Sequence, residues 1–270
     1  MTDIKLKQIA KKIRRIIFDK VAKNGGHIST SFSAVEILVS IYFDKYFKFN
    51  KKIMNSDKRD YFILSKGHAA ILMFSILFKK GILSKKNFNK NYKSGDYSLG
   101  GHVCHKTPGI EASTGAVGHG LGLACGIALS NKLKKLKNYT FVLLGDAECS
   151  EGSVWEAAIF ANKFKLNNLI AIVDNNKIGA TDFTKSYIDF NNLEKMFKSF
   201  GWIVKKCDGH NFKDIRKKIQ YLKKSKLLKP KIIIAETIKG KGLNFLENDP
   251  SWHSRKMDDK QIRSGRIKLK

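Results

Sequence analysis

The stretch that most constrains the fold is residues 139–178, which reads as a strand, a helix, a second strand and a polar turn. It contains two short, largely apolar runs without a charged residue, residues 139–144 and 169–173. Such runs are typical of strands that are buried on both faces of a sheet. Between them, apolar residues recur at helical spacing (Val154, Trp155, Ala158, Ile159 and Ala161). The pattern therefore predicts a βαβ unit with parallel strands and a right-handed crossover.

Polar residues follow both predicted strands. Gly145 and Asp146 end the first strand, and Asn176 lies in the turn that closes the second. Because the carboxyl ends of parallel strands meet at one edge of the sheet, Asp146 and Asn176 should lie close together there, where open α/β folds bind ligands. A carboxylate, an amide oxygen and nearby backbone carbonyls form an oxygen-only set that suits Mg²⁺. The same residues could instead cap the helix and form a turn, and their spacing does not separate the two interpretations. Ser150 is the predicted N-cap of the helix, and Glu151 favours its positive end.

A resemblance to a known family rests on this stretch. Residues 145–176 resemble the metal and diphosphate motif of thiamine diphosphate enzymes, and residues 151–158 resemble transketolases in particular. The resemblance covers nearly the whole chain. It implies an α/β fold of three layers, with helices on both faces of a mostly parallel sheet, and a single thiamine diphosphate-binding domain over residues 1–270. It also implies Mg²⁺, or another divalent cation such as Ca²⁺ or Mn²⁺, bound by the side chains of Asp146 and Asn176 and the backbone carbonyl of Ile178.

The same resemblance assigns the other site residues. It implies that His27, His102 and His253 are catalytic, as groups that move protons or bind substrate hydroxyls, with His253 close to the cofactor phosphate. Taken singly, His27 is equally consistent with an ordinary loop position, and His68 with a capping or packing role. The implied cofactor-binding residues are His68, Gly115, Ala116, Val117, Gly145, Asp146, Ala147, Glu151, Asn176, Ile178 and His253.

Two positions depart from the family pattern. Ala147 stands where glycine is usual, and His119 stands where glutamine is usual. If position 147 needs a positive φ, alanine costs about 1 kcal/mol there. A binding protein without catalytic activity is therefore one alternative. A second is another thiamine diphosphate enzyme, such as a deoxyxylulose-phosphate synthase, although residues 151–155 favour transketolase.

The reaction implied by the resemblance is the transfer of a two-carbon ketol unit between sugar phosphates, with thiamine diphosphate as the electron sink. In transketolases, the glutamate beside the aminopyrimidine ring lies in the next domain, the pyrimidine-binding one. The chain contains no match to that domain or to the family's C-terminal domain. The resemblance thus predicts a split enzyme, in which this N-terminal subunit needs a C-terminal transketolase subunit, in an assembly with two copies of each chain.

Composition bears on where the chain works. No apolar run approaches the roughly 20 residues of a membrane span, so no membrane partner is expected. The four cysteines are scattered without a C-x-x-C pair, which favours a reduced cytoplasm over a zinc site or disulfide framework. A formal charge of +29 raises the question of nucleic acid. Lysine is spread along the whole chain, however, without a basic block or an aromatic stacking motif. We therefore expect no nucleic-acid partner.

Hydrophobic periodicity and turn residues also predict the surrounding elements. Helices are expected at residues 4–24, 31–47, 71–78, 115–133, 193–200 and 212–222, and strands at residues 61–64, 202–204 and 230–235. Residues 84–99 are expected to form a loop with a short helix, residues 178–189 a surface loop, and His210 part of a turn.

Overall fold

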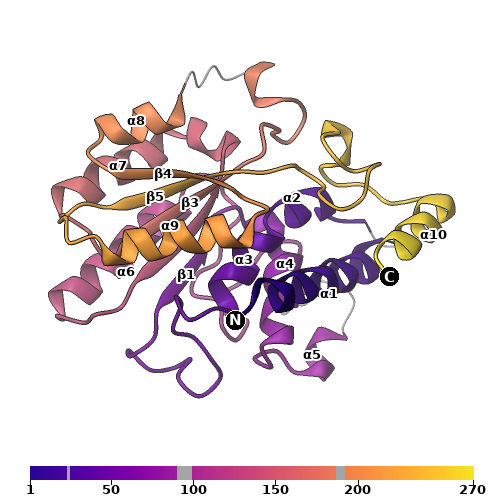
Figure 1. The fold of residues 1–270 in the computed structure, drawn as a ribbon, viewed down its shortest axis with the longest axis horizontal. Helices are drawn as coiled ribbons and strands as arrows, with labels where there is room; N and C mark the ends of the chain where they lie inside the picture. Colours follow the sequence, from indigo (N-terminus) through magenta and orange to yellow (C-terminus); the bar gives the residue numbers. More distant parts are fainter. Residues whose placement is uncertain (23–24, 90–98, 187–191) are drawn as a thin grey trace.

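A single parallel sheet forms the centre of the computed structural model, which describes residues 1–22, 25–89, 99–186 and 192–270. Its five strands lie in the order β1-β2-β3-β5-β4, and every neighbouring pair is parallel (Figure 1). The strands are β1 (Tyr61–Leu64), β2 (Thr140–Gly145), β3 (Leu169–Asn175), β4 (Ile203–Asp208) and β5 (Lys231–Glu236). In the register of β2 and β3, Gly145 lies opposite Asp174. The predicted parallel βαβ unit is confirmed.

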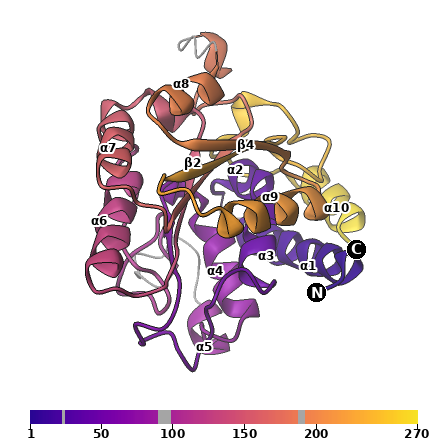
Figure 2. The same cartoon turned by 60° about the vertical axis from the view of Figure 1, so that its left-hand side comes forward.

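Helices cover both faces of this sheet, which gives the predicted three layers (Figure 2). One face carries α6 (Gly120–Leu133), α7 (Gly152–Lys163) and α8 (Leu193–Ser199). The other carries α1 (Asp3–Val21), α2 (Ile28–Ser33), α3 (Val35–Tyr42), α4 (Ala70–Lys79) and α9 (Phe212–Lys224). Because side chains alternate along a strand, Phe141 and Leu143 of β2 enter one core, while Val142 and Leu144 enter the other. This two-sided burial explains why the sequence of β2 is almost wholly apolar.

Short elements complete the chain. They are α5 (Lys85–Phe88), α10 (Asp259–Lys268) and the 3₁₀ turns η1 (Gly67–Ala69), η3 (Ala147–Ser150), η4 (Thr184–Ser186) and η5 (Pro250–Trp252). The predicted loops fall partly outside the described residues, at 90–98 and 187–189, as does the predicted end of the first helix at Asn24. Among the described helices, none combines the length and the apolar character needed to cross a bilayer.

Several sequence predictions were wrong in detail. The helix expected from residue 115 begins at Gly120, and the strand expected at residues 202–204 is the longer β4. The single helix expected at residues 31–47 is two helices, α2 and α3, separated at Ala34, where φ is −101° and ψ is 8°. Before this break, the Ser33 hydroxyl reaches Asp174 on β3 at 2.5 Å, a tertiary contact that no local pattern reveals. Ser150 does not cap α7, because it lies inside η3 and donates to the Ala147 carbonyl. Glu151 occupies the N-cap position instead.

Candidate functional site

A cavity of about 320 Å³ opens at the carboxyl edge of the sheet, where the segments that follow β1, β2, β3 and β5 meet. Parallel α/β sheets bind ligands at this edge. Twelve of the residues named from the sequence line the cavity: His27, His68, His102, Gly115, Val117, Gly145, Asp146, Ala147, Glu151, Asn176, Ile178 and His253.

Four histidines from separate parts of the chain gather in this cavity. The ring centroid of His27 lies 5.6, 5.8 and 5.1 Å from those of His68, His102 and His253. Burial, followed by the lysines of the same cavity, lowers the pKa of His68 well below its ordinary value and that of His253 to about 4. These two rings are therefore neutral near pH 7. A neutral imidazole can both donate and accept a hydrogen bond, which suits binding of hydroxyl groups and movement of protons.

Asp146 is a buried carboxylate at the end of β2. Its Oδ1 accepts from the Ala147 N–H at 2.8 Å, and its Oδ2 accepts from the Lys177 N–H. Burial and the nearby charge of Asp174 raise the pKa of Asp146 to about 6, so the site electrostatically favours a cation beside this carboxylate. Ala147 lies in η3 and is not among the residues with a positive φ, so the cost expected for replacing glycine does not arise.

The other two implied metal ligands are held just beyond β3. The Asn176 Oδ1 accepts from the Ile178 N–H at 3.1 Å. The Lys239 ammonium donates to the Gly179 carbonyl at 2.5 Å and to the Ile178 carbonyl at 3.4 Å. The Lys239 ammonium thus places a positive charge against the Ile178 carbonyl, in the position that the implied metal ion would take. Together with Asp146, this oxygen set fits a hard divalent cation.

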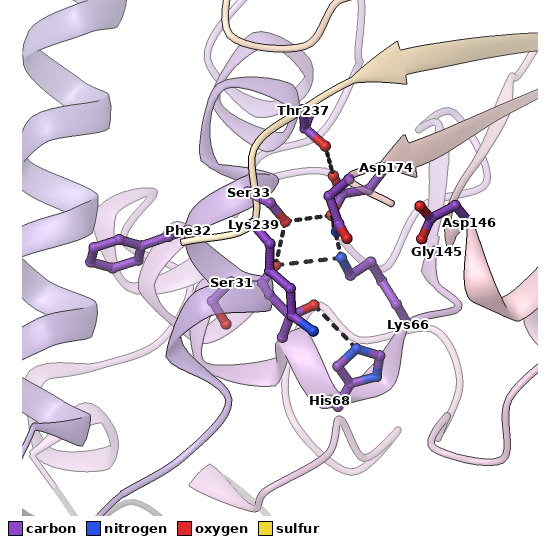
Figure 3. Close-up of polar contacts among 12 residues, drawn as sticks. Ser31, Phe32, Ser33, Lys66, His68, Gly145, Asp146, Asp174, Thr237 and Lys239 are labelled. Atoms are coloured by element: carbon purple, nitrogen blue, oxygen red, sulfur yellow. Dashed lines mark hydrogen bonds and ion pairs between the residues drawn. The ribbon is translucent and has the colours of Figure 1, made fainter. Parts of the chain in front are cut away.

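A buried network centred on Asp174 fixes the floor of the cavity (Figure 3). Asp174 is fully buried on β3 and accepts hydrogen bonds from Lys66 Nζ, from Ser33 Oγ and from Thr237 Oγ1. Burial opposes the charge of Asp174, but the Lys66 ammonium outweighs it and holds the pKa of this carboxyl below its ordinary value. Lys66 also donates to the Thr30 carbonyl at 3.4 Å. The network joins α2, the turn after β1, β3 and the segment after β5.

The Glu148 carboxylate accepts hydrogen bonds from three other segments around the site. Its Oε1 accepts from the Ser65 hydroxyl and from the Gly118 N–H at 3.0 Å, and its Oε2 accepts from the Gly145 N–H at 2.9 Å. Gly118 has a φ of +90°, and a Cβ there would lie 2.6 Å from the Cβ of Glu151. Glycine is therefore required where this turn approaches the start of α7.

A few residues named from the sequence lie outside the main cavity. Ala116 lines a neighbouring cavity of about 440 Å³, together with His102 and His119. His119 sits at the N-cap position of α6 without a capping hydrogen bond from its side chain. His105 is exposed, and its Nδ1 lies 3.0 Å from the Ser113 hydroxyl. In the part of the chain that the structure describes, no cluster of three His, Cys, Asp or Glu side chains is arranged for a metal ion.

Sequence reasoning missed several residues that line the cavity. They are Thr30, Lys66, Glu148, Gly179 and Ala180. Lys239 also lines the cavity; it was not named as a site residue, although residues 239–243 resemble the family loop that closes over the diphosphate. Lys66 had a usable signal, because it stands between an apolar strand and His68 in a chain whose other lysines are mostly on polar faces. A charged residue in an apolar context is seldom buried unless it has a partner.

Comparisons with known proteins agree with this geometry. Residues 5–270 match the family described as the thiamine diphosphate-binding domain of transketolase. An apulose-4-phosphate transketolase subunit from Actinobacillus succinogenes is 39% identical over 251 residues, which cover 92% of this chain and 90% of the relative. The 6-deoxy-6-sulfo-D-fructose transketolase subunit of a Clostridium species is 32% identical over 267 residues, covering 98% and 96%. Human transketolase is 34% identical over 252 residues, covering 93% of this chain and 40% of its own.

Among solved structures, transketolase from Campylobacter jejuni matches with a TM-score of 0.92 at 28% identity, over 100% of this chain and 43% of that one. The chain therefore belongs to the transketolase family, within which it forms the thiamine diphosphate-binding domain. It spans nearly the whole length of the relatives that are named as subunits, but only about two fifths of the human and Campylobacter transketolases.

Proposed function

We propose that this chain is the diphosphate- and metal-binding subunit of a transketolase divided between two polypeptides. The observation that carries the proposal is the carboxyl-edge cavity, where Asp146, Asn176 and the Ile178 carbonyl lie beside a row of histidines. Its subunit character is supported by the relatives that carry the word subunit in their names and that align over 90% and 96% of their length. The proposed reaction transfers a two-carbon ketol unit between sugar phosphates or related sugars.

The residues of the cavity divide into two groups by what they would bind, a cation or a diphosphate. Asp146, Asn176 and Ile178 would hold Mg²⁺ or a similar divalent cation, and the ammonium groups of Lys66 and Lys239 supply positive charge for a diphosphate. When bound, thiamine diphosphate supplies the electron sink for carbon–carbon cleavage. The chain's own part is to bind, orient and exclude water from the reacting groups.

The histidines are the proposed proton carriers. His27 and His102 are placed to bind substrate hydroxyls and to move protons between them, with ring centroids 5.8 Å apart. The Nδ1 atom of His253 is buried without a hydrogen-bond partner among the described residues, which fits a group that waits for a ligand. His68 Nε2 lies 3.1 Å from the Thr30 hydroxyl, so His68 is better placed to orient a ligand than to react.

A partner subunit is proposed on the face of α6 and α7. Exposed apolar side chains gather there: Val117, Leu123, Ile159, Phe160 and Phe164. Two glycines of α6, Gly122 and Gly126, have no neighbouring atom within 4 Å of an added Cβ, which leaves room for close helix packing. Because Val117 also lines the cofactor cavity, a polypeptide on this face would complete the site. We propose the chain with the pyrimidine-binding domain, together with self-association into a two-plus-two assembly.

The compartment proposed for this enzyme is the cytoplasm. All four cysteines are free thiols, three of them buried, as expected for a reducing environment.

The decisive experiment compares the purified chain with the chain co-expressed with its partner. We expect calorimetry to detect thiamine diphosphate binding that depends on Mg²⁺. We expect an activity assay to detect ketol transfer from a ketose phosphate only when both polypeptides are present. The proposal fails if the isolated chain turns over substrate, or if the complex binds no thiamine diphosphate at millimolar concentrations.

A further inference from the structure

Lys239 enters the cavity from the irregular backbone that follows β5. It is 1% exposed, although the neighbouring residues 238–241 belong to no helix or strand. A buried lysine on irregular backbone needs its main chain held by other elements. The backbone N–H of Ile238, directly before Lys239, donates to His210 Nε2 at 2.8 Å. His210 lies in the turn between β4 and α9, as the sequence predicted, and makes this long-range contact in addition.

The hydrogen bonds of His210 define its tautomer. Because Nε2 accepts from a backbone N–H, the ring proton is on Nδ1, which lies 3.0 Å from Glu36 Oε2 and donates to it. Burial opposes the charge of Glu36, but Arg14 and His210 outweigh it and lower the pKa of Glu36 to about 2. The carboxylate is therefore ionised throughout the physiological range, and it fixes both the tautomer and the direction of the imidazole ring.

Arg14 grips the same segment from its other side. Its guanidinium binds Glu36 in a bidentate manner at 2.5 and 2.7 Å, and its Nε donates to the Lys241 carbonyl at 2.8 Å. The Gly240 N–H donates to the Ser29 carbonyl at 2.9 Å. Each residue that flanks Lys239 is thus bonded to a different element of the fold.

We propose that His210 is a positioning residue of the cofactor site. With Glu36 and Arg14 it clamps residues 238–241, so that the Lys239 ammonium stays in the cavity beside the Ile178 and Gly179 carbonyls. Without the imidazole, the Ile238 N–H loses its acceptor, and residue 238 is no longer held to the turn between β4 and α9. The inference rests on the proposed function only in that Lys239 belongs to the site that receives the diphosphate.

A double-mutant cycle on cofactor affinity tests whether His210 acts through Lys239. Thiamine diphosphate binding is measured by calorimetry on the two-subunit complex in Mg²⁺, for His210→Ala, Lys239→Met and the double variant. Loss of one backbone hydrogen bond to the clamp predicts about fivefold to tenfold weaker binding for His210→Ala. The double variant should bind within about twofold of Lys239→Met, because a residue that acts through Lys239 has nothing left to position. The exposed His105→Ala is the matched control and should bind like the wild-type protein.

A second measurement needs no cofactor. Trypsin cleaves after lysine, so the Lys239 and Lys241 bonds report directly on the clamp. In the cofactor-free chain, we expect His210→Ala to raise the rate of cleavage at these two bonds at least fivefold, as identified by mass spectrometry. Cleavage elsewhere, and in His105→Ala, should be unchanged. His210→Gln, which keeps a polar side chain, is the second variant if His210→Ala does not fold, and it should show the same direction of change.

The outcomes separate this inference from the proposed function. If the wild-type complex binds no thiamine diphosphate, the proposed function fails, and the proteolysis still decides whether His210 clamps the segment. If wild type binds the cofactor but His210→Ala binds equally well, the positioning role is refuted. It is also refuted if the effects of His210→Ala and Lys239→Met multiply, or if cleavage after Lys239 and Lys241 does not accelerate.

Discussion

Replacing Asp146 by asparagine should stabilise the protein without cofactor while it removes metal and cofactor binding. Asp146 and Asp174 are buried carboxylates at the ends of neighbouring strands. Lys66 pairs directly with Asp174, whereas Asp146 accepts from the backbone N–H groups of Ala147 and Lys177. The fold therefore carries an unfavourable charge for the sake of the ligand, a common trade between stability and function.

The magnitude follows from the pKa of Asp146, which rises from 3.8 to about 6 on folding. Because the folded pKa is raised, the folded state holds this proton more tightly than the unfolded state, so ionisation costs stability as the pH rises from about 4 through 6. A shift of roughly two units corresponds to about 3 kcal/mol at pH 7.5. The asparagine keeps one acceptor oxygen, so one backbone N–H loses its partner, at about 1–2 kcal/mol. The expected net gain is about 1–2 kcal/mol at pH 7.5.

Urea titrations followed by circular dichroism, with a chelator present, measure this difference. At pH 4 the carboxyl of the wild-type protein is already protonated in the folded state, so the gain should disappear or become a small loss. The exposed Asp57→Asn is the control and should change the free energy of unfolding by no more than about 0.5 kcal/mol. The reasoning is refuted if Asp146→Asn is less stable than wild type at pH 7.5, or if its gain is the same at both pH values.

Four further substitutions test other parts of the structure. Glu36→Gln should cost about 3 kcal/mol at pH 7, because the pKa of Glu36 falls from 4.5 to about 2 on folding. A lowered folded pKa stabilises above the unfolded value, so the cost should shrink as urea titrations move from pH 4.5 toward pH 2. Gly120→Ala places a Cβ 2.2 Å from Ser65 Oγ and should cost more than about 2 kcal/mol, whereas Gly122→Ala, which meets nothing within 4 Å, should gain about 0.5–1 kcal/mol in thermal or urea unfolding. In calorimetry without thiamine diphosphate, Lys239→Met should bind Mn²⁺ more tightly than wild type. The variant lacks the ammonium that donates to the Ile178 and Gly179 carbonyls in the wild-type protein.

The local sequence pattern was enough to predict the two strands that position the metal and diphosphate motif. The strands β2 and β3 could be predicted because both faces of each strand are buried, which keeps residues 139–144 and 169–173 without a charged side chain. Once the two strands are parallel, the position of Asp146 and Asn176 at one edge follows from topology alone. The roles of His27, His68, His102 and His253, in contrast, came from family resemblance, since nothing in their local sequence places four histidines around one cavity.

Contacts between distant segments could not be predicted in this way. Lys66 and Asp174 are 108 positions apart and His210 and Glu36 are 174 apart, and each residue alone reads as an ordinary polar position. The break between α2 and α3 has the same origin, because Ser33 is drawn toward Asp174 by a contact across the sheet edge. Local propensity gives way wherever a buried charge has to be satisfied.

The charges of the cavity, rather than those of the whole chain, determine what the site can accept. The formal charge of +29 is spread over the sequence, but the cavity is lined by three acidic side chains, Asp146, Glu148 and Glu151, and by two lysines, Lys66 and Lys239. Asp174 lies buried behind the cavity as the ion-pair partner of Lys66, so acidic groups outnumber basic ones. A diphosphate alone would leave this buried set with excess negative charge, and a divalent cation alone would compete with Lys239 for the Ile178 carbonyl. If both were bound, the anion would lie against the ammonium and the cation against the carbonyl, so that neither charge would be buried without its counterpart. Lys239, held in place from both sides, thus supplies a positive charge against the Ile178 carbonyl, where a cation was expected.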